Sequence, residues 1–171
     1  MSQDIQQERM TTQAVLDAIT REREKLGAAI DRAGDRATTL AVTGEWTAQD
    51  VLAHLVHYAG QIAFGVGAPM HPPPWVEGVT ERLSGDQWSA RAVAHYKGMS
   101  LAEVRRDLNT VVDALVARLR TRSDEQMNAT DAIPWAEPRA LWRQVGAETF
   151  LHWPVHVVDI ERALGARAEV R

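Results

Sequence analysis

The chain has 171 residues, of which 45% are hydrophobic and 25% charged, and its formal net charge is −4. These values are typical of a single globular domain, here residues 1–171, and the negative charge argues against nucleic acid or anionic lipid as a partner. The chain has no apolar run long enough to cross a membrane and its first residues are polar, so we expect a cytoplasmic protein without membrane contact.

Hydrophobic residues at helical spacing predict a first helix from Gln13 to about Ala33. The second helix has a clear start, because Thr47 and Asp50, three residues later, form the pattern of a capping box. This helix is expected to fade at Gly65. The three successive prolines that follow in GAPMHPPPW exclude a helix, because proline lacks the backbone donor and has a fixed φ.

The connection between the second and third long helices is long enough to contain a short helix of its own. Ser84 and Gln87 predict that such a helix starts there and runs to about Tyr96, and we expect it to lie over one end of the bundle. Ser100 and Glu103 form a further capping box that opens the third long helix. That helix has the most regular apolar stripe in the chain: Leu101, Val104, Leu108, Val111, Leu115 and Leu119.

The last helix is expected to run from Pro138 to about Leu164, after a linker at 121–137. Its segment LHWPVHVVDI is rich in β-branched residues, but strand alternation would give one face an incoherent mixture of side chains. We therefore predict a helix with Pro154 in its interior, kinked there at a cost of about 3 kcal/mol. Four long amphipathic helices indicate an all-α fold, a four-helix bundle.

Histidine provides the strongest signal for chemistry. The chain has no cysteine, so a metal would have to be held by His, Asp or Glu. His152 and His156 are four residues apart, which places both imidazoles on one helix face, and His54 on the second helix could join them in the bundle interior. Three neutral imidazoles with an open fourth position are typical of a catalytic metal site. Asp159 and Asp50 could accept the outer ring protons of these histidines, although Asp50 is equally explained as a helix cap.

Other residues are assigned to the surroundings of this site. Tyr58 and Gln61 on the second helix could line the wall of a pocket, and Trp75, in the proline-rich loop, could form its mouth. Trp135 and Trp142 are further aromatic candidates for the mouth, with plain core the better interpretation for Trp142. The remaining histidines are interpreted as structural or exposed: His57, His71 and His95.

The segments WTAQDVLAHL and HWPVHVVDIERALG resemble the DinB-like superfamily of metal-binding four-helix bundles. That group includes mycothiol- and bacillithiol-dependent S-transferases and the metal-binding domain of mycothiol-dependent maleylpyruvate isomerase. Trp46, Asp50 and His54 match the Trp-x-x-x-Asp-x-x-x-His pattern of the family's second helix, and residues 1–171 would form one DinB-like domain.

The resemblance also implies the ligand pair on the last helix. The isomerase-like branch usually has Glu followed by His four residues later, then Asp after three more. His152, His156 and Asp159 match this spacing with His in place of Glu. An alternative register of Glu148 and His152 has no aspartate at that distance, so the first register is preferred.

The resemblance implies a divalent metal, zinc first, with nickel or iron as alternatives, that activates a low-molecular-weight thiol. The thiolate would attack a small electrophile, giving S-transfer or thiol-assisted isomerisation. Only two lysines occur beside many arginines, a bias of GC-rich genomes that favours mycothiol as the thiol. Two alternatives remain: a metal-dependent hydrolase with Glu148 or Asp159 as base, and a non-catalytic binding or resistance protein for small molecules. A homodimer through the first and third long helices is a further expectation.

Overall fold

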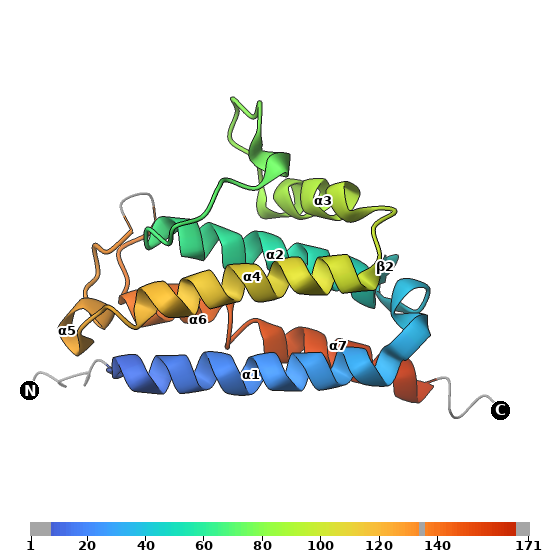
Figure 1. Ribbon diagram of the computed structural model, residues 1–171, viewed down its shortest axis with the longest axis horizontal. Coiled ribbons are helices and arrows are strands. Elements are labelled where there is room, and N and C mark those ends of the chain that lie inside the picture. Colours follow the sequence, from blue (N-terminus) through green and yellow to red (C-terminus); the bar gives the residue numbers. More distant parts are fainter. Residues whose placement is uncertain (1–7, 134–135, 167–171) are drawn as a thin grey trace, which may run out of the picture.

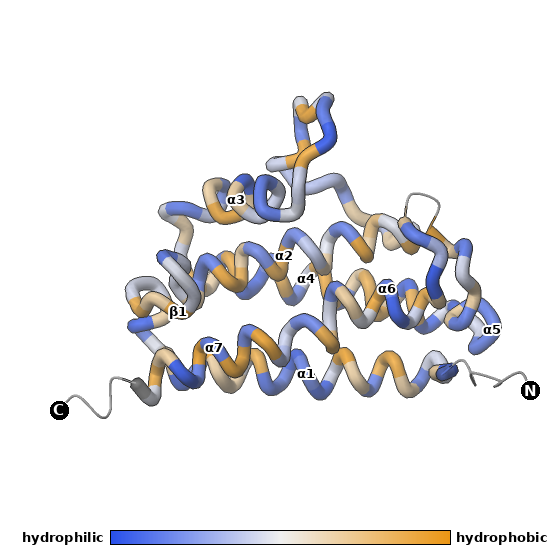
Figure 2. The backbone as a smooth tube through the Cα atoms, turned by 180° about the vertical axis from the view of Figure 1, so that it is seen from behind, coloured by the Kyte–Doolittle hydropathy of each residue, from blue (hydrophilic) through white to orange (hydrophobic). Residues whose placement is uncertain are grey.

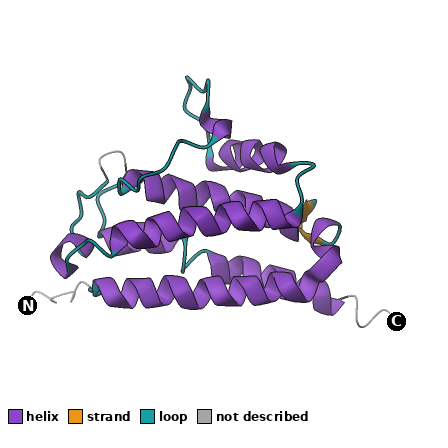
Figure 3. Ribbon diagram, viewed as in Figure 1, coloured by secondary structure: helices purple, strands orange, loops and turns teal. Residues whose placement is uncertain are grey.

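The computed structural model describes residues 8–133 and 136–166, and within them most of the chain is helical, with loops as the main remaining part (Figure 3). The expected all-α class is therefore confirmed; Trp135 lies outside the described residues. The α-helices are α1 (Thr12–Ala33), α2 (Ala48–Gly65), α3 (Gly85–Tyr96), α4 (Leu101–Leu119), α5 (Asp124–Met127), α6 (Leu141–Glu148) and α7 (Trp153–Ala166). Shorter elements are the 3₁₀ turns η1 (Gly34–Thr38) and η2 (Pro74–Val76) and the strands β1 (Ala41–Thr43) and β2 (Trp46–Thr47).

Helix α2 is the centre of the bundle. It packs against α4, α6 and α3, while α1 lies beside α7 on the far side of the molecule from α3 (Figure 1). Because α2 has neighbours on most sides, it is buried nearly all round, as Val51, Leu52, Leu55 and Val56 show. The outer helices α1 and α7 instead alternate between polar and apolar residues along the chain (Figure 2). Most residues of α2 are thus placed in the interior, and Phe64 near its end is the exposed exception among the large apolar ones.

The helix starts agree with the sequence prediction, because capping is a local interaction. Each expected capping box is present, with the cap hydroxyl accepting from a backbone N–H and the acid or amide side chain accepting in return. The pairs are Thr47 with Asp50, Ser84 with Gln87, and Ser100 with Glu103.

A two-stranded hairpin precedes α2 and was not predicted. Ala41 pairs with Thr47 and Thr43 with Trp46, and Gly44 takes a positive φ of 56° in the turn between them. Strands of three and two residues are too short to show alternation in the sequence. The hairpin contacts α7 and leads directly into the cap of α2, so it ties the start of α2 to the last helix.

The sequence led us to expect helix α3 over one end of the bundle, and this expectation is wrong. The helix runs along α2 on the face away from α1 and α7 (Figure 1). Tyr96 and Ala92 of α3 are buried there, and the Arg91 guanidinium donates to the carbonyl of Trp75 at 2.8 Å, which joins α3 to η2. The connection therefore forms an additional layer over the central helix.

The last helix is divided in two, which corrects the prediction of one kinked helix from Pro138 to Leu164. Helix α6 ends at Glu148, and Thr149 takes φ −135° and ψ −103°, outside the helical region. The N–H of Trp153 then donates to the Thr149 carbonyl at 2.8 Å as α7 begins. Pro154 is the second residue of α7, where an N–H would have no helical partner, so the predicted cost of an interior proline is avoided.

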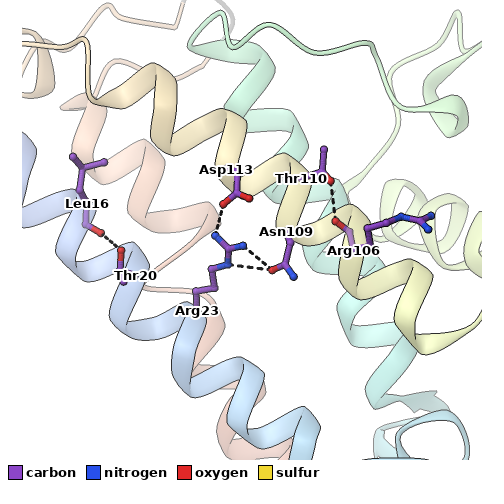
Figure 4. A network of polar contacts seen from close by, with 7 residues as sticks. All are labelled: Leu16, Thr20, Arg23, Arg106, Asn109, Thr110 and Asp113. Carbon is purple, nitrogen blue, oxygen red and sulfur yellow. Dashed lines mark hydrogen bonds and ion pairs between the residues drawn. The ribbon is translucent and has the colours of Figure 1, made fainter.

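Polar side chains join the outer faces of α1 and α4. The Arg23 guanidinium donates to Asp113 at 2.6 Å and to the Asn109 side-chain oxygen at 2.9 and 3.1 Å (Figure 4). A cavity of about 590 Å³ opens along the same two helices, with Arg105 and Asp31 paired farther along it. Contacts of this kind are partly exposed and contribute little stability each, so the bundle depends on the apolar packing around α2.

No helix in the described part of the chain is both long and apolar enough to span a membrane. The large apolar side chains that are exposed there do not lie on α1 and α4, where we expected a dimer surface. They lie at the end of α2 and on the outer side of segment 151–158: Phe64, Leu151, Val155 and Val158.

Pro154→Ala tests the position of the break. Because Pro154 occupies the first turn of α7, we expect the substitution to change the free energy of unfolding by less than about 1 kcal/mol. Ile160→Ala is the positive control, because it removes a fully buried side chain from the same helix. It should lower the free energy of unfolding, measured by urea denaturation, by about 2–5 kcal/mol. A gain of several kcal/mol in Pro154→Ala would instead indicate a proline inside a continuous helix.

Candidate metal centre

Three imidazoles converge between α2 and the start of α7. The Nε2 atom of His152 lies 3.2 Å from Nε2 of His54 and 3.0 Å from Nε2 of His156. One ring nitrogen from each of the three residues lies within 4.8 Å of the others. The structure thus brings together the three histidines that the sequence singled out, each presenting the same ring nitrogen.

The break between α6 and α7 determines how the two C-terminal histidines reach this point. His152 is the residue immediately before α7, and His156 is in its first turns. The sequence placed both on a continuous helix, whereas His152 is presented by the turn that precedes it. His54, in the second turn of α2, meets them from the central helix. His156 is buried, and His54 and His152 are partly buried.

A serine on α3 sets the orientation and tautomer of His54. The Ser89 hydroxyl is buried, lies 2.9 Å from His54 Nδ1 and donates its proton to the Gly85 carbonyl at 2.9 Å. Since the hydroxyl has a single proton, it can only accept from His54, so Nδ1 carries the ring proton and Nε2 presents its lone pair. The sequence is compatible with Asp50 as either this partner or a helix cap, and its carboxylate is engaged in the cap with Thr47.

Asp159 lies near the outer nitrogen of His156. Its carboxylate is 4.0 Å from Nδ1 of His156, beyond hydrogen-bond length, and it also accepts from Arg162 at 3.1 Å. The Nδ1 atoms of His152 and His156 have no hydrogen-bond partner among the described residues. Asp159 therefore lies near the ring nitrogen from which we expected it to accept a proton, but it makes no hydrogen bond to it.

Burial keeps the imidazoles uncharged at neutral pH. Desolvation, together with the neighbouring histidines, lowers the pKa of His54 from 6.5 to about 3. Desolvation and His156 lower the pKa of His152 to about 4. The pKa of His156 is also lowered by burial, with Asp159 acting in the opposite direction. Neutral rings with free lone pairs are the form that binds metal ions.

Aromatic side chains surround the three rings. The centroid of Tyr58 lies 4.7 Å from that of His54 and 5.4 Å from that of His152, so this residue borders the cluster, and its role in a pocket wall stays a prediction. Trp46 contacts His54 from the hairpin side at 5.2 Å. A Cβ at Gly85 would come within 2.9 Å of the Tyr58 hydroxyl, so only glycine leaves this hydroxyl its present position.

His57 has more structure around it than the sequence suggested. The indole N–H of Trp75 donates to His57 Nδ1 at 3.0 Å, and Trp88 stacks on the imidazole at 5.5 Å with an interplanar angle of 20°. Trp75 is itself buried and does not stand at a pocket mouth. Among the other histidines, His71 is exposed and His95 packs against Trp75. No signal within the local sequence links His57 to two tryptophans that follow it by 18 and 31 residues.

Glu148 lies apart from the three imidazoles. It lines a small cavity of about 180 Å³ together with Gln61, Gln144 and Arg139, and it is not one of the donors gathered in the histidine cluster within the described residues. Burial raises the pKa of its carboxyl from 4.5 to about 7, with Arg139 acting in the opposite direction. The cluster therefore uses the register of His152 with His156. Trp142 is buried core.

Comparison with solved structures places the fold among known helical proteins. An uncharacterised protein from Escherichia coli UTI89 has a TM-score of 0.75 and 15% identity, over 92% of this chain and 95% of its own. The sibling lethal factor precursor DfsB has a TM-score of 0.75 and 14% identity, over 94% of this chain and 98% of its own. The colibactin self-resistance protein ClbS, in complex with double-stranded DNA, has a TM-score of 0.71 and 11% identity, over 90% of this chain and 95% of its own. In sequence, the chain matches no family model and no curated protein. The shared feature is the all-helical fold.

The neutral state of His57 predicts a loss of stability in acid. The unfolded chain binds a proton at His57 as the pH falls through 6.5, whereas the folded state binds it only near pH 4, where desolvation has placed this pKa. The free energy of unfolding should fall between these values, by about 1.4 kcal/mol per pH unit for this residue. Urea denaturation in the presence of a chelator measures the slope. His57→Phe should reduce it, and His71→Ala, at an exposed position, should leave it unchanged.

Glu148 predicts the opposite dependence. Its carboxyl stays protonated in the folded state up to about pH 7, while the unfolded chain ionises from 4.5, so folding loses stability as the pH rises through this window. Glu148→Gln keeps the shape without ionising, and its stability relative to the native chain should increase from pH 4.5 to 7. Urea denaturation checks this, with exposed Glu77→Gln as control. A constant difference across the window would contradict the burial argument.

Proposed function

We propose that His54, His152 and His156 bind a divalent metal, zinc first and nickel or iron as alternatives, in a thiol S-transferase-like enzyme. The thiol would be a low-molecular-weight compound, mycothiol in the first instance, and the second substrate a small electrophile. The observation that carries the proposal is the convergence of three Nε2 atoms at 3.0 and 3.2 Å.

The donor set fits a metal. Nitrogens that bind one zinc ion tetrahedrally at 2.0–2.1 Å lie about 3.3 Å from one another, comparable with the two Nε2 separations given above. Ser89 holds His54 with the lone pair of Nε2 directed at the proposed metal position. The lowered pKa values keep His54 and His152 uncharged at neutral pH. Three imidazoles leave a fourth position for an exogenous ligand, as catalytic sites do. Two of the rings have buried outer nitrogens without partners among the described residues, where a small movement of Asp159 would supply one acceptor.

The side chains around the centre suggest how a substrate would be held. A bound divalent metal would act as a Lewis acid and stabilise the thiolate form of an exogenous thiol at neutral pH. The chain has no cysteine, so the nucleophilic sulfur has to come from the substrate. Tyr58, whose ring lies beside His54 and His152, would orient a bound molecule, and the absence of a side chain at Gly85 leaves room for its hydroxyl. Gln61, two turns after His54 on α2, would contact only a longer thiol, whereas Trp75 is buried against His57.

The DinB-like resemblance supports the same proposal. Trp46 and Asp50, which match the family pattern, have local roles that serve His54: one packs on its ring and the other caps its helix. The solved structures of similar fold are compatible with this superfamily, although the likeness carries the fold alone.

A second candidate is a binding or resistance protein without catalysis. It is favoured by the name of one structural neighbour, the colibactin self-resistance protein. Because that neighbour was solved with double-stranded DNA, nucleic acid is also a partner to test here, despite a net charge of −4 that weakens attraction to phosphates. Ligand binding that is unaffected by a chelator would favour this candidate, and turnover of a substrate without thiol would favour a hydrolase that uses metal-bound water.

Metal analysis and an adduct assay test the leading proposal together. We expect one divalent ion per chain, and formation of a thiol adduct when mycothiol and monochlorobimane are supplied, followed by mass. His156→Ala should lose both the ion and the adduct. Ser89→Ala should weaken metal binding by about 10- to 100-fold, because His54 loses the partner that orients it. His71→Ala is the control with an exposed histidine, and equal adduct rates in His156→Ala would remove these imidazoles from the reaction.

A further inference from the structure

A further cavity lies beside His57, between α2, the proline-rich segment and α3. Its volume is about 370 Å³, within the range of small-molecule sites. None of the three clustered histidines lines it. Its walls are mostly apolar: Gly60, Phe64, Pro72, Pro73, Val76, Val79 and Trp88, with His57, Gln61 and Glu81 as the polar members.

His57 is a hydrogen-bond donor at this cavity. An indole N–H can only donate, so the contact from Trp75 leaves Nδ1 of His57 as the acceptor and places the ring proton on Nε2. The residue is only 3% exposed, and Nε2 has no hydrogen-bond partner among the described residues. A buried donor without an acceptor is unfavourable, and an acceptor on a bound molecule would relieve it.

The charges around the cavity restrict what can enter. Among the described residues that line the cavity, Glu81 is the one ionisable group besides His57, and it is exposed. Desolvation holds the pKa of His57 near 4, so its ring is uncharged at neutral pH. No lining residue in the described part of the chain offers a positive charge to an anion. Phe64, which is 55% exposed, adds apolar surface at the opening.

We propose that this cavity binds a small uncharged molecule with an apolar, ring-sized body and one carbonyl or ether oxygen that accepts from His57 Nε2. The apolar body lies against Pro72, Pro73 and Val76, and the oxygen meets the imidazole under Trp88. Binding does not require a metal at the three clustered histidines, so it is independent of the function proposed above.

Three ring compounds of similar size provide the test, used with chelator-treated protein and followed by NMR titration. Acetophenone has the carbonyl acceptor, α-methylstyrene replaces its oxygen with a CH₂ group, and benzoate introduces a negative charge. We expect acetophenone to bind about five- to tenfold more tightly than α-methylstyrene, the value of one neutral hydrogen bond, and benzoate to bind most weakly. Long-range ¹H–¹⁵N spectra should show the Nε2–H tautomer of His57 and a shift of this proton with acetophenone alone.

A cavity-filling variant locates the site without disturbing His57. A Cβ at Gly60 would lie 3.8 Å from Pro73 and 4.0 Å from Met70, ordinary contact distances, so a side chain can begin there without displacing a neighbour. Gly60→Leu is expected to extend that side chain into the cavity, and urea denaturation checks that the variant is folded. The variant should abolish acetophenone binding. Gly165→Leu is the control, because a Cβ there meets nothing within 4 Å. Equal affinity for acetophenone and α-methylstyrene, unchanged binding in Gly60→Leu, or no binding of acetophenone at millimolar concentration would each overturn the proposal.

Discussion

Uncharged imidazoles packed around a buried central helix are the constraint on which the rest of this structure depends. His54 and His57 are both on α2, which has neighbours on most sides, so neither ring can be protonated without a large desolvation cost. Each therefore needs partners that suit a neutral ring: a serine that accepts from one and an indole that donates to the other. The two partners give the rings opposite tautomers, and this difference directs one lone pair and one N–H toward two different places.

The break before α7 serves the same constraint. A continuous helix through 148–156 would have kept Glu148, His152 and His156 on one face, and a carboxylate beside the rings would have favoured their protonation. With the chain turned at Thr149, Glu148 belongs to another cavity, and among the described residues the cluster contains imidazoles alone. The proline that looked expensive in the sequence lies in the first turn of the new helix, so the division between α6 and α7 fits the local preferences of the chain.

The sequence predicted what depends on near neighbours or on simple spacing. Capping pairs such as Thr47 with Asp50 fixed the helix starts, and the spacing of His152 and His156 with a third histidine on α2 identified the cluster. What it could not predict depends on how distant segments pack. Ser89 replaced Asp50 as the partner of His54 because α3 lies along α2, and that placement has no local signature. The tryptophan partners of His57 were missed for the same reason.

Helix α3 contacts both imidazoles of α2 through consecutive residues, Trp88 over His57 and Ser89 beside His54. Because Trp88 and Ser89 are adjacent in a rigid helix, they move together. If α3 slides or tilts, the stacking of Trp88 on His57 and the hydrogen bond between Ser89 and His54 change in the same movement. A molecule that binds beneath Trp88 would therefore also strain the hydrogen bond to His54. The cavity beside His57 and the histidine cluster would in this way be linked mechanically through two adjacent residues of α3.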